Sequence, residues 1–208
     1  MTDCLKLENR HTGEILRVRR VRDSEGQWVI LLDGSLPPGK DGPPRHIHFV
    51  ETESGRVTSG TLGARVGDKE IVVPAGGSAL FPAGTTHAWW NAGQDLLEFN
   101  GEASPAADLD RYLQAVFAVV NAGEPGRPSL FHMAHVAWRH RDTQALTVVP
   151  PFLQRLILPV ILLVGHLLGK YRGDHWPGCP ASCPGAPEMD AADAPRSPEQ
   201  LRNTAKAR

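Results

Sequence analysis

The chain has 208 residues and a formal net charge of −1, from 22 Lys and Arg against 23 Asp and Glu. This length fits one domain with additions, and an apolar fraction of 41% is enough for a hydrophobic core. The near-neutral charge gives no electrostatic case for binding nucleic acid. The segment from Met1 to Glu8 has acidic residues and lacks the apolar core of a signal peptide. The chain has three cysteines, Cys4, Cys179 and Cys183, and this odd number does not suggest a full set of disulfides. We therefore expect a cytoplasmic protein.

Short strands are predicted between residues 14 and 100. The evidence is a set of alternating or apolar runs separated by turn residues: 15–21, 28–32, 71–73 and 96–99. Gly67-Asp68 is a good two-residue hairpin connection. Short strands at this spacing predict a mainly β fold, an antiparallel barrel or sandwich.

Helices are predicted after residue 104. Ser104 and Pro105 suit the start of a helix, and Asn121 to Gly123 its end. The residues between them carry an apolar stripe at helical spacing: Leu109, Tyr112, Leu113, Val116, Phe117 and Val120. A second, weaker helix is predicted from Ser129 to His140, where His132 and His135 are interpreted as a polar face rather than a second metal site.

A third apolar stretch, 152–168, follows Pro150 and Pro151. A helix that is apolar nearly all round must be buried somewhere. We expect it to pack on the barrel or on a partner chain in a homodimer. Insertion into a membrane or its interface is the alternative, which Arg155 and His166 disfavour. The region from 173 to 208 is rich in Pro, Ala, Gly and charge, and is predicted to be a disordered tail.

Histidine clusters are the strongest functional signal. His46 and His48 are two residues apart, and on a strand such residues share a face. Glu51 and Glu53 follow them, and His87 lies in a second cluster after turn residues. Converging imidazoles and a carboxylate predict a mononuclear metal site. These ligands suit Fe, Mn, Ni, Cu or Zn without choosing among them.

Two motifs make the chain resemble the cupins, whose motifs flank a small jelly-roll barrel. The first is matched from the His-x-His pair onward, by His46, His48, Glu53 and Gly60, whereas Gly39 lies one residue too far upstream. The second is matched without a gap by Gly76, Pro82, Gly84, His87 and Asn91. The resemblance covers about residues 10 to 105. It implies a double-stranded β-helix barrel in 1–104, followed by a helical extension in 105–172.

The resemblance also implies site residues. One divalent metal would be held by His46, His48, Glu53 and His87, and the motif spacing favours Glu53 over Glu51. Glu53 lies at an odd offset from both histidines, so a bend must separate them. Glu53 is also the candidate catalytic base. Trp89, two residues after His87, is the candidate for contacting substrate, with a plain core role as the alternative.

The function implied is a metal-dependent enzyme acting on a small organic molecule, with a dioxygenase-type oxidoreductase as the leading hypothesis. A non-redox isomerase or lyase is the first alternative. A non-catalytic small-molecule binding or sensor protein is the second. No helix-turn-helix segment for DNA is evident.

Overall fold

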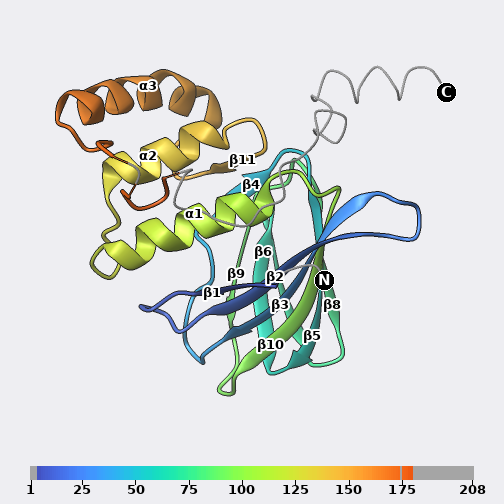
Figure 1. The fold of residues 1–208 in the computed structure, drawn as a ribbon. Coiled ribbons are helices and arrows are strands. Elements are labelled where there is room, and N and C mark those ends of the chain that lie inside the picture. Colours follow the sequence, from blue (N-terminus) through green and yellow to red (C-terminus); the bar gives the residue numbers. More distant parts are fainter. Residues whose placement is uncertain (1–3, 174, 180–208) are drawn as a thin grey trace.

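The computed structural model describes residues 4–173 and 175–179. Two antiparallel sheets form a β-barrel, and three helices gather beside it (Figure 1). The six-stranded sheet has, in spatial order, β1 (Leu5–Glu8), β2 (Ile15–Arg22), β3 (Trp28–Leu36), β10 (Leu97–Ser104), β5 (Thr52–Ser59) and β8 (Ser78–Phe81). The five-stranded sheet has β11 (Gln144–Leu146), β4 (His46–His48), β9 (His87–Asn91), β6 (Thr61–Val66) and β7 (Lys69–Pro74).

The predicted strands and hairpin are present. Strands β2, β3, β7 and β10 contain the four predicted runs except Leu96, which precedes β10. Gly67 has a φ of +59° and connects β6 to β7, where Val66 pairs with Lys69. Along β2 the side chains alternate: Leu16 and Val18 are buried, and Arg17 between them is exposed. Buried residues of this kind from both sheets build the core inside the barrel.

The chain changes sheets immediately after the His-x-His pair. Strand β4 belongs to the five-stranded sheet and β5 to the six-stranded one, and a bend at 49–50 joins them. This bend resolves the odd offset of Glu53, because the inward face is defined separately for each sheet. The edge of β4 is covered by β11, which comes from about a hundred residues later in the chain and pairs Gln144 with His48.

The first helix, α1 (Leu109–Ala122), ends where the sequence predicts but begins later. Ser104 does not cap it, because Ser104 is still paired with Thr52 in the sheet. The helix begins at Leu109, and Arg20 of β2 binds to its first turn. Arg20 donates to both carboxylate oxygens of Asp110, at 2.9 and 2.6 Å, and the two side chains are only 8% and 11% exposed. This buried bidentate pair fixes α1 on the barrel.

The second and third helices lie on the far side of α1 from the barrel (Figure 1). Helix α2 (Leu130–Arg139) is capped by Ser129, which accepts a hydrogen bond from the His132 backbone, as the predicted second helix requires. Helix α3 (Pro151–Leu167) packs mainly on α2. Their approach is close at Gly165, where an added Cβ would lie 2.9 Å from the Phe131 ring.

The outward face of α3 is apolar and exposed. Phe152, Leu156, Val160, Leu163 and Leu167 each expose at least 60% of their surface. Within residues 4–173 and 175–179, no helix has both the length and the hydropathy needed to cross a bilayer. A homodimer that covers this face stays a prediction.

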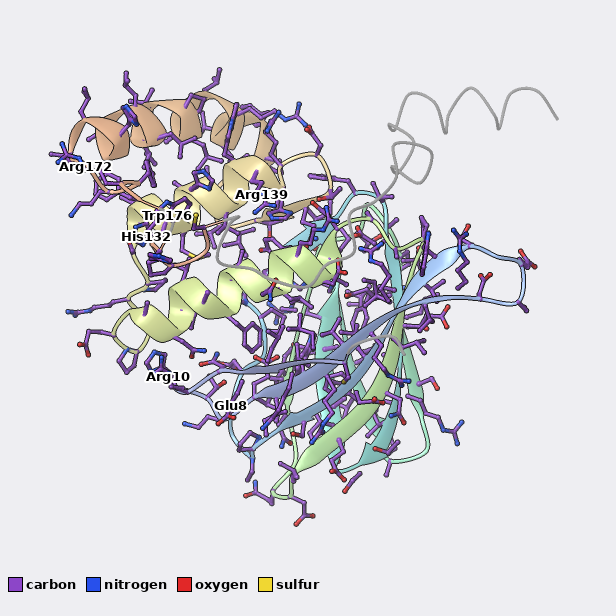
Figure 2. All side chains as sticks on the ribbon, viewed as in Figure 1. Glu8, Arg10, His132, Arg139, Arg172 and Trp176 are labelled. Atoms are coloured by element: carbon purple, nitrogen blue, oxygen red, sulfur yellow. The ribbon has the colours of Figure 1, made fainter. Side chains whose placement is uncertain are left out.

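The start of the predicted tail lies against the helices. Trp176 stacks on His132 of α2, with ring centroids 5.4 Å apart (Figure 2). Cys179 is buried, and Gly178 approaches Val119 of α1. Residues 174 and 180–208, which make up most of the predicted tail, lie outside the described residues.

Candidate metal centre

Four side chains converge inside the barrel: His46, His48, Glu53 and His87. Each offers one ligand atom, and these atoms all lie within 4.8 Å of one another. The histidines come from β4 and β9 in one sheet and Glu53 from β5 in the other. The structure therefore brings together the whole predicted set, from three strands and both walls of the barrel.

Backbone pairing sets the positions of the histidines. His46 and His87 are direct cross-strand partners of β4 and β9, and their ring centroids are 4.2 Å apart. The turn before β9 is held in place by the Gly84 N–H, which donates to the His48 carbonyl at 2.7 Å. Gly84 has a φ of +76°, a conformation that favours glycine. The Pro-x-Gly turn thus delivers His87 beside the His-x-His pair.

The imidazoles of His46 and His87 each donate a hydrogen bond at the outer edge, and that of His48 faces a carboxylate there without a hydrogen bond to it. His46 Nδ1 donates to the Pro44 carbonyl at 2.8 Å, and His87 Nδ1 donates to the Thr85 carbonyl at 3.0 Å. His48 Nδ1 lies 3.8 Å from a carboxylate oxygen of Glu51. A proton held on Nδ1 leaves the Nε2 lone pair free, and outer acceptors of this kind orient metal-ligating histidines.

The inner atoms lack the partners that buried polar atoms need. Among the described residues, neither ring nitrogen of His48 has a hydrogen-bond partner, and Nε2 lies 3.7 Å from Glu53 Oε2. His87 Nε2 lies 3.2 Å from the same oxygen. With the His87 proton on Nδ1, this contact sets a nitrogen lone pair against a carboxylate. A positive centre between them is required, either an added proton or a metal ion, so the residues fit a divalent cation.

The electrostatics of the cluster suit the same ion. Burial, with help from His87 and His48, lowers the pKa of His46 to about 3. Burial acts against the carboxylate of Glu53, but His48, His87 and His46 outweigh it and lower its pKa to about 2. Burial also acts against protonation of His48, but Glu53 and Glu51 outweigh it and raise its pKa. His46 and Glu53 are thus in the neutral and ionised forms that metals bind, and the raised pKa of His48 shows that the centre attracts positive charge, which a metal ion would supply in place of the proton.

Glu51, the rival carboxylate, lies behind the cluster. It is fully buried, and its nearest ligand contact is the outer edge of His48 rather than the centre. The sequence offered both glutamates; only the bend after β4 turns Glu53 inward and leaves Glu51 on the far side. Its part as a partner of His48 is one that the sequence did not indicate.

A cavity of about 280 Å³ opens from the cluster. Its walls include His46, His48 and Glu53 together with apolar side chains of the barrel, such as Phe81, Trp89 and Phe99. The apolar stripe of α1 forms another wall. All six residues of the stripe that predicts this helix line the cavity. The sequence predicts the stripe but not that it faces a cavity, since a helix that packs on a core has the same spacing.

Of the other residues singled out in the sequence, Trp89 lines the cavity and the rest take structural places. Trp89 meets Phe99 edge-on, with centroids 5.1 Å apart. The Asn91 side chain stabilises a turn by donating hydrogen bonds to the carbonyls of Leu36 and Asp95. His132 and His135 meet Trp176 and do not join the four-residue cluster.

Comparison with known proteins gives the family. A family model described as a cupin domain matches residues 32–99. The protein called "Oxidoreductase iacF" from Pestalotiopsis fici is 31% identical over 156 residues, which are 67% of this chain and 74% of that protein. The chain belongs to the cupin superfamily. "Probable oxidoreductase virH" from Hypocrea virens is also similar to this cupin, at 27% identity over 170 residues, 72% of this chain and 76% of that protein.

A solved structure similar to this cupin is KdgF from Halomonas sp. It is 17% identical and has a TM-score of 0.41, over 52% of this chain and 90% of that one. The predicted fold class, a mainly β cupin barrel with a C-terminal helical extension, is confirmed. The family and the cluster together support a metal-binding cupin.

Proposed function

We propose that this cupin is a metal-dependent oxidoreductase of the dioxygenase type that acts on a small, largely apolar organic molecule. The observation that carries the proposal is the cluster of three imidazoles and one carboxylate at the wall of an apolar cavity. The names of two relatives as oxidoreductases support the reaction class. Dioxygen is the oxidant in this proposal, and both of its atoms end in the oxidised product.

His46, His48, His87 and Glu53 would hold one divalent metal, which supplies a Lewis-acid and electron-transfer centre. The protein does the rest. Glu53 lines the cavity and is 18% exposed, so it can accept the proton of a substrate hydroxyl. Trp89 and Phe99 form an edge-on aromatic wall that orients a flat or hydrocarbon substrate. The apolar lining keeps bulk water from the reacting group.

The first test is metal content. Protein reconstituted with Fe(II), Mn, Ni, Cu or Zn should hold one ion per chain by elemental analysis. A His46→Ala, His48→Ala double variant should lose the ion. A His132→Ala variant is the matched control, because His132 lies outside the cluster and should leave metal content unchanged. Full occupancy in the double variant refutes the site.

The second test separates this function from its alternatives. Bound Fe together with substrate-dependent uptake of dioxygen supports the oxidoreductase. Bound Zn or Ni with turnover that consumes no dioxygen would favour the isomerase or lyase. A small molecule bound without any metal would favour the sensor.

A further inference from the structure

Glu14 occupies a position where the strand pattern calls for an apolar residue. It immediately precedes β2, and it shares the inward face with Leu16 and Val18 because residues two apart on a strand point the same way. Leu16 and Val18 belong to the hydrophobic core. Glu14 is only 6% exposed and lines the same cavity as the metal cluster. A carboxyl group thus stands among hydrocarbon at the cavity wall.

The Glu14 side chain has no protein partner among the described residues. Within 4–173 and 175–179, no hydrogen bond or ion pair reaches its carboxyl group. Burial without compensation raises the pKa of Glu14 to about 7. Polar groups buried in proteins are normally hydrogen-bonded, and an unpartnered one is destabilising. The missing partner is one that the cavity can admit.

The backbone around Glu14 is rigid. The Glu14 N–H donates to Thr12 Oγ1 at 3.2 Å, and its carbonyl accepts from the Asn9 N–H at 2.9 Å. The Asn9 side chain in turn accepts from the backbone of His11 and Thr12. Gly13, with a φ of +78°, allows the tight turn. Glu14 is therefore held in place as a preorganised group rather than as a loose surface residue.

Hydrogen bonds attach the same turn to the C-terminal end of α1. Arg10 N–H donates to the Asn121 side chain at 2.9 Å, and that side chain donates to the Glu8 carbonyl at 2.7 Å. His11 Nε2 donates to the Val120 carbonyl at 3.1 Å. These hydrogen bonds place Glu14 beside the last turn of α1, the helix that lines the cavity.

The metal cluster lies at the other end of that helix. Asp108, just before α1, is close enough to His48 to raise its pKa. From Leu109 to Val120, a rise of 1.5 Å per residue gives roughly 16 Å. The cavity thus lies between Glu14 at one end of α1 and the metal cluster at the other, and its lining is mainly apolar.

We propose that Glu14 is a substrate-recognition residue, and that the cavity takes an elongated apolar molecule with a hydroxyl group at the end remote from the metal cluster. A hydroxyl suits this position because it donates to a carboxylate and accepts from a carboxyl group, so it pairs with Glu14 in either protonation state. A cationic amine would pair well only with the ionised form of Glu14, whereas a hydroxyl pairs with both forms. The inference rests on the proposed function only in placing the reacting end of the substrate at His46, His48 and Glu53.

The test measures binding without turnover, on the full chain after removal of metal by a chelator. The probe is decane-1,10-diol, an apolar chain with a hydroxyl at each end; its dimethyl ether, which cannot donate a hydrogen bond, is the control ligand. Both compete against an apolar fluorescent dye at pH 8. In Glu14→Leu the diol should bind at least about tenfold more weakly, the loss expected for a hydrogen bond to a charged group. The ether should bind within about twofold of its affinity for the wild type.

Each outcome decides the question. Glu14→Gln keeps an acceptor of the same size and should retain most of the affinity for the diol. Glu14→Met makes the same comparison if Glu14→Leu does not fold. An unchanged affinity for the diol in either apolar variant, or failure of the diol to bind the wild type, overturns the proposal. Because metal is absent throughout, a failure of the metal site would leave this result intact, and the two proposals fail separately.

Discussion

The division of work between Glu53 and Glu51 can be tested by matched substitutions. Glu53 Oε2 lies 3.2 Å from His87 Nε2 and 3.7 Å from His48 Nε2, at the centre of the cluster. Glu51 approaches only the outer Nδ1 of His48, at 3.8 Å. Glu53→Gln therefore removes the one anionic ligand. Glu51→Gln removes only the negative charge beside the outer edge of His48. Glutamine keeps the volume of each side chain, so packing is preserved in both variants.

The expected losses differ in size. Loss of an outer partner of a metal-binding histidine weakens metal affinity by roughly 10- to 100-fold. This corresponds to about 1.4 to 2.8 kcal/mol for Glu51→Gln. Glu53→Gln should exceed the upper end of that range, because a charged ligand is lost from a set of four. Glu25→Gln, at an exposed loop position, should have no effect.

The assay is competition for Zn²⁺ between the protein and a chromophoric chelator, at one pH and ionic strength. Circular dichroism of the metal-free proteins checks that each variant folds. A larger loss in Glu51→Gln than in Glu53→Gln would show that the wrong carboxylate has been assigned. Equal losses would contradict the assignment of Glu53 as the ligand and Glu51 as an outer neighbour.

Three further predictions concern stability and assembly. Asp110→Ala leaves the buried Arg20 guanidinium unpaired and should lower the free energy of unfolding by about 3 to 5 kcal/mol in urea titrations; a loss below about 1 kcal/mol would contradict this. Because burial raises the pKa of Glu14 to about 7, the wild type should lose stability relative to Glu14→Gln as pH rises from about 4.5 to about 7. Parallel stability curves for these two proteins would be evidence against a buried, unpartnered carboxyl. We also expect a homodimer that covers the apolar face of α3; light scattering should give the mass of two chains, and a monomer mass over a broad concentration range would rule it out.

Local patterns determined much of this protein. The alternation of β2 and the turn at Gly67 follow from side-chain sterics along a strand and at a positive φ, so they can be predicted from a few residues. The His46 and His48 pair is likewise local, because two residues on one short strand share a face. The spacing of the cupin motifs extended this to His87 and Glu53.

Contacts between distant segments decided the rest. Ser104 has good capping chemistry, but its pairing with Thr52 keeps it in the sheet, and Arg20 sets the first turn of α1 at Asp110. Strand β11 exists because β4 offers it an open edge, which no short window of sequence can show.

The cavity depends most on tertiary structure. The apolar stripe of α1 would have the same spacing whether it packed into the barrel or lined a cavity. Only the contacts that attach the helix to the barrel leave space beneath it. Glu14 precedes β2, and β1 and β3 pair with the two edges of β2. The burial of Glu14 is therefore a property of the assembled barrel. Periodicity determines which way a side chain points, but only the packing of remote elements determines what it meets there.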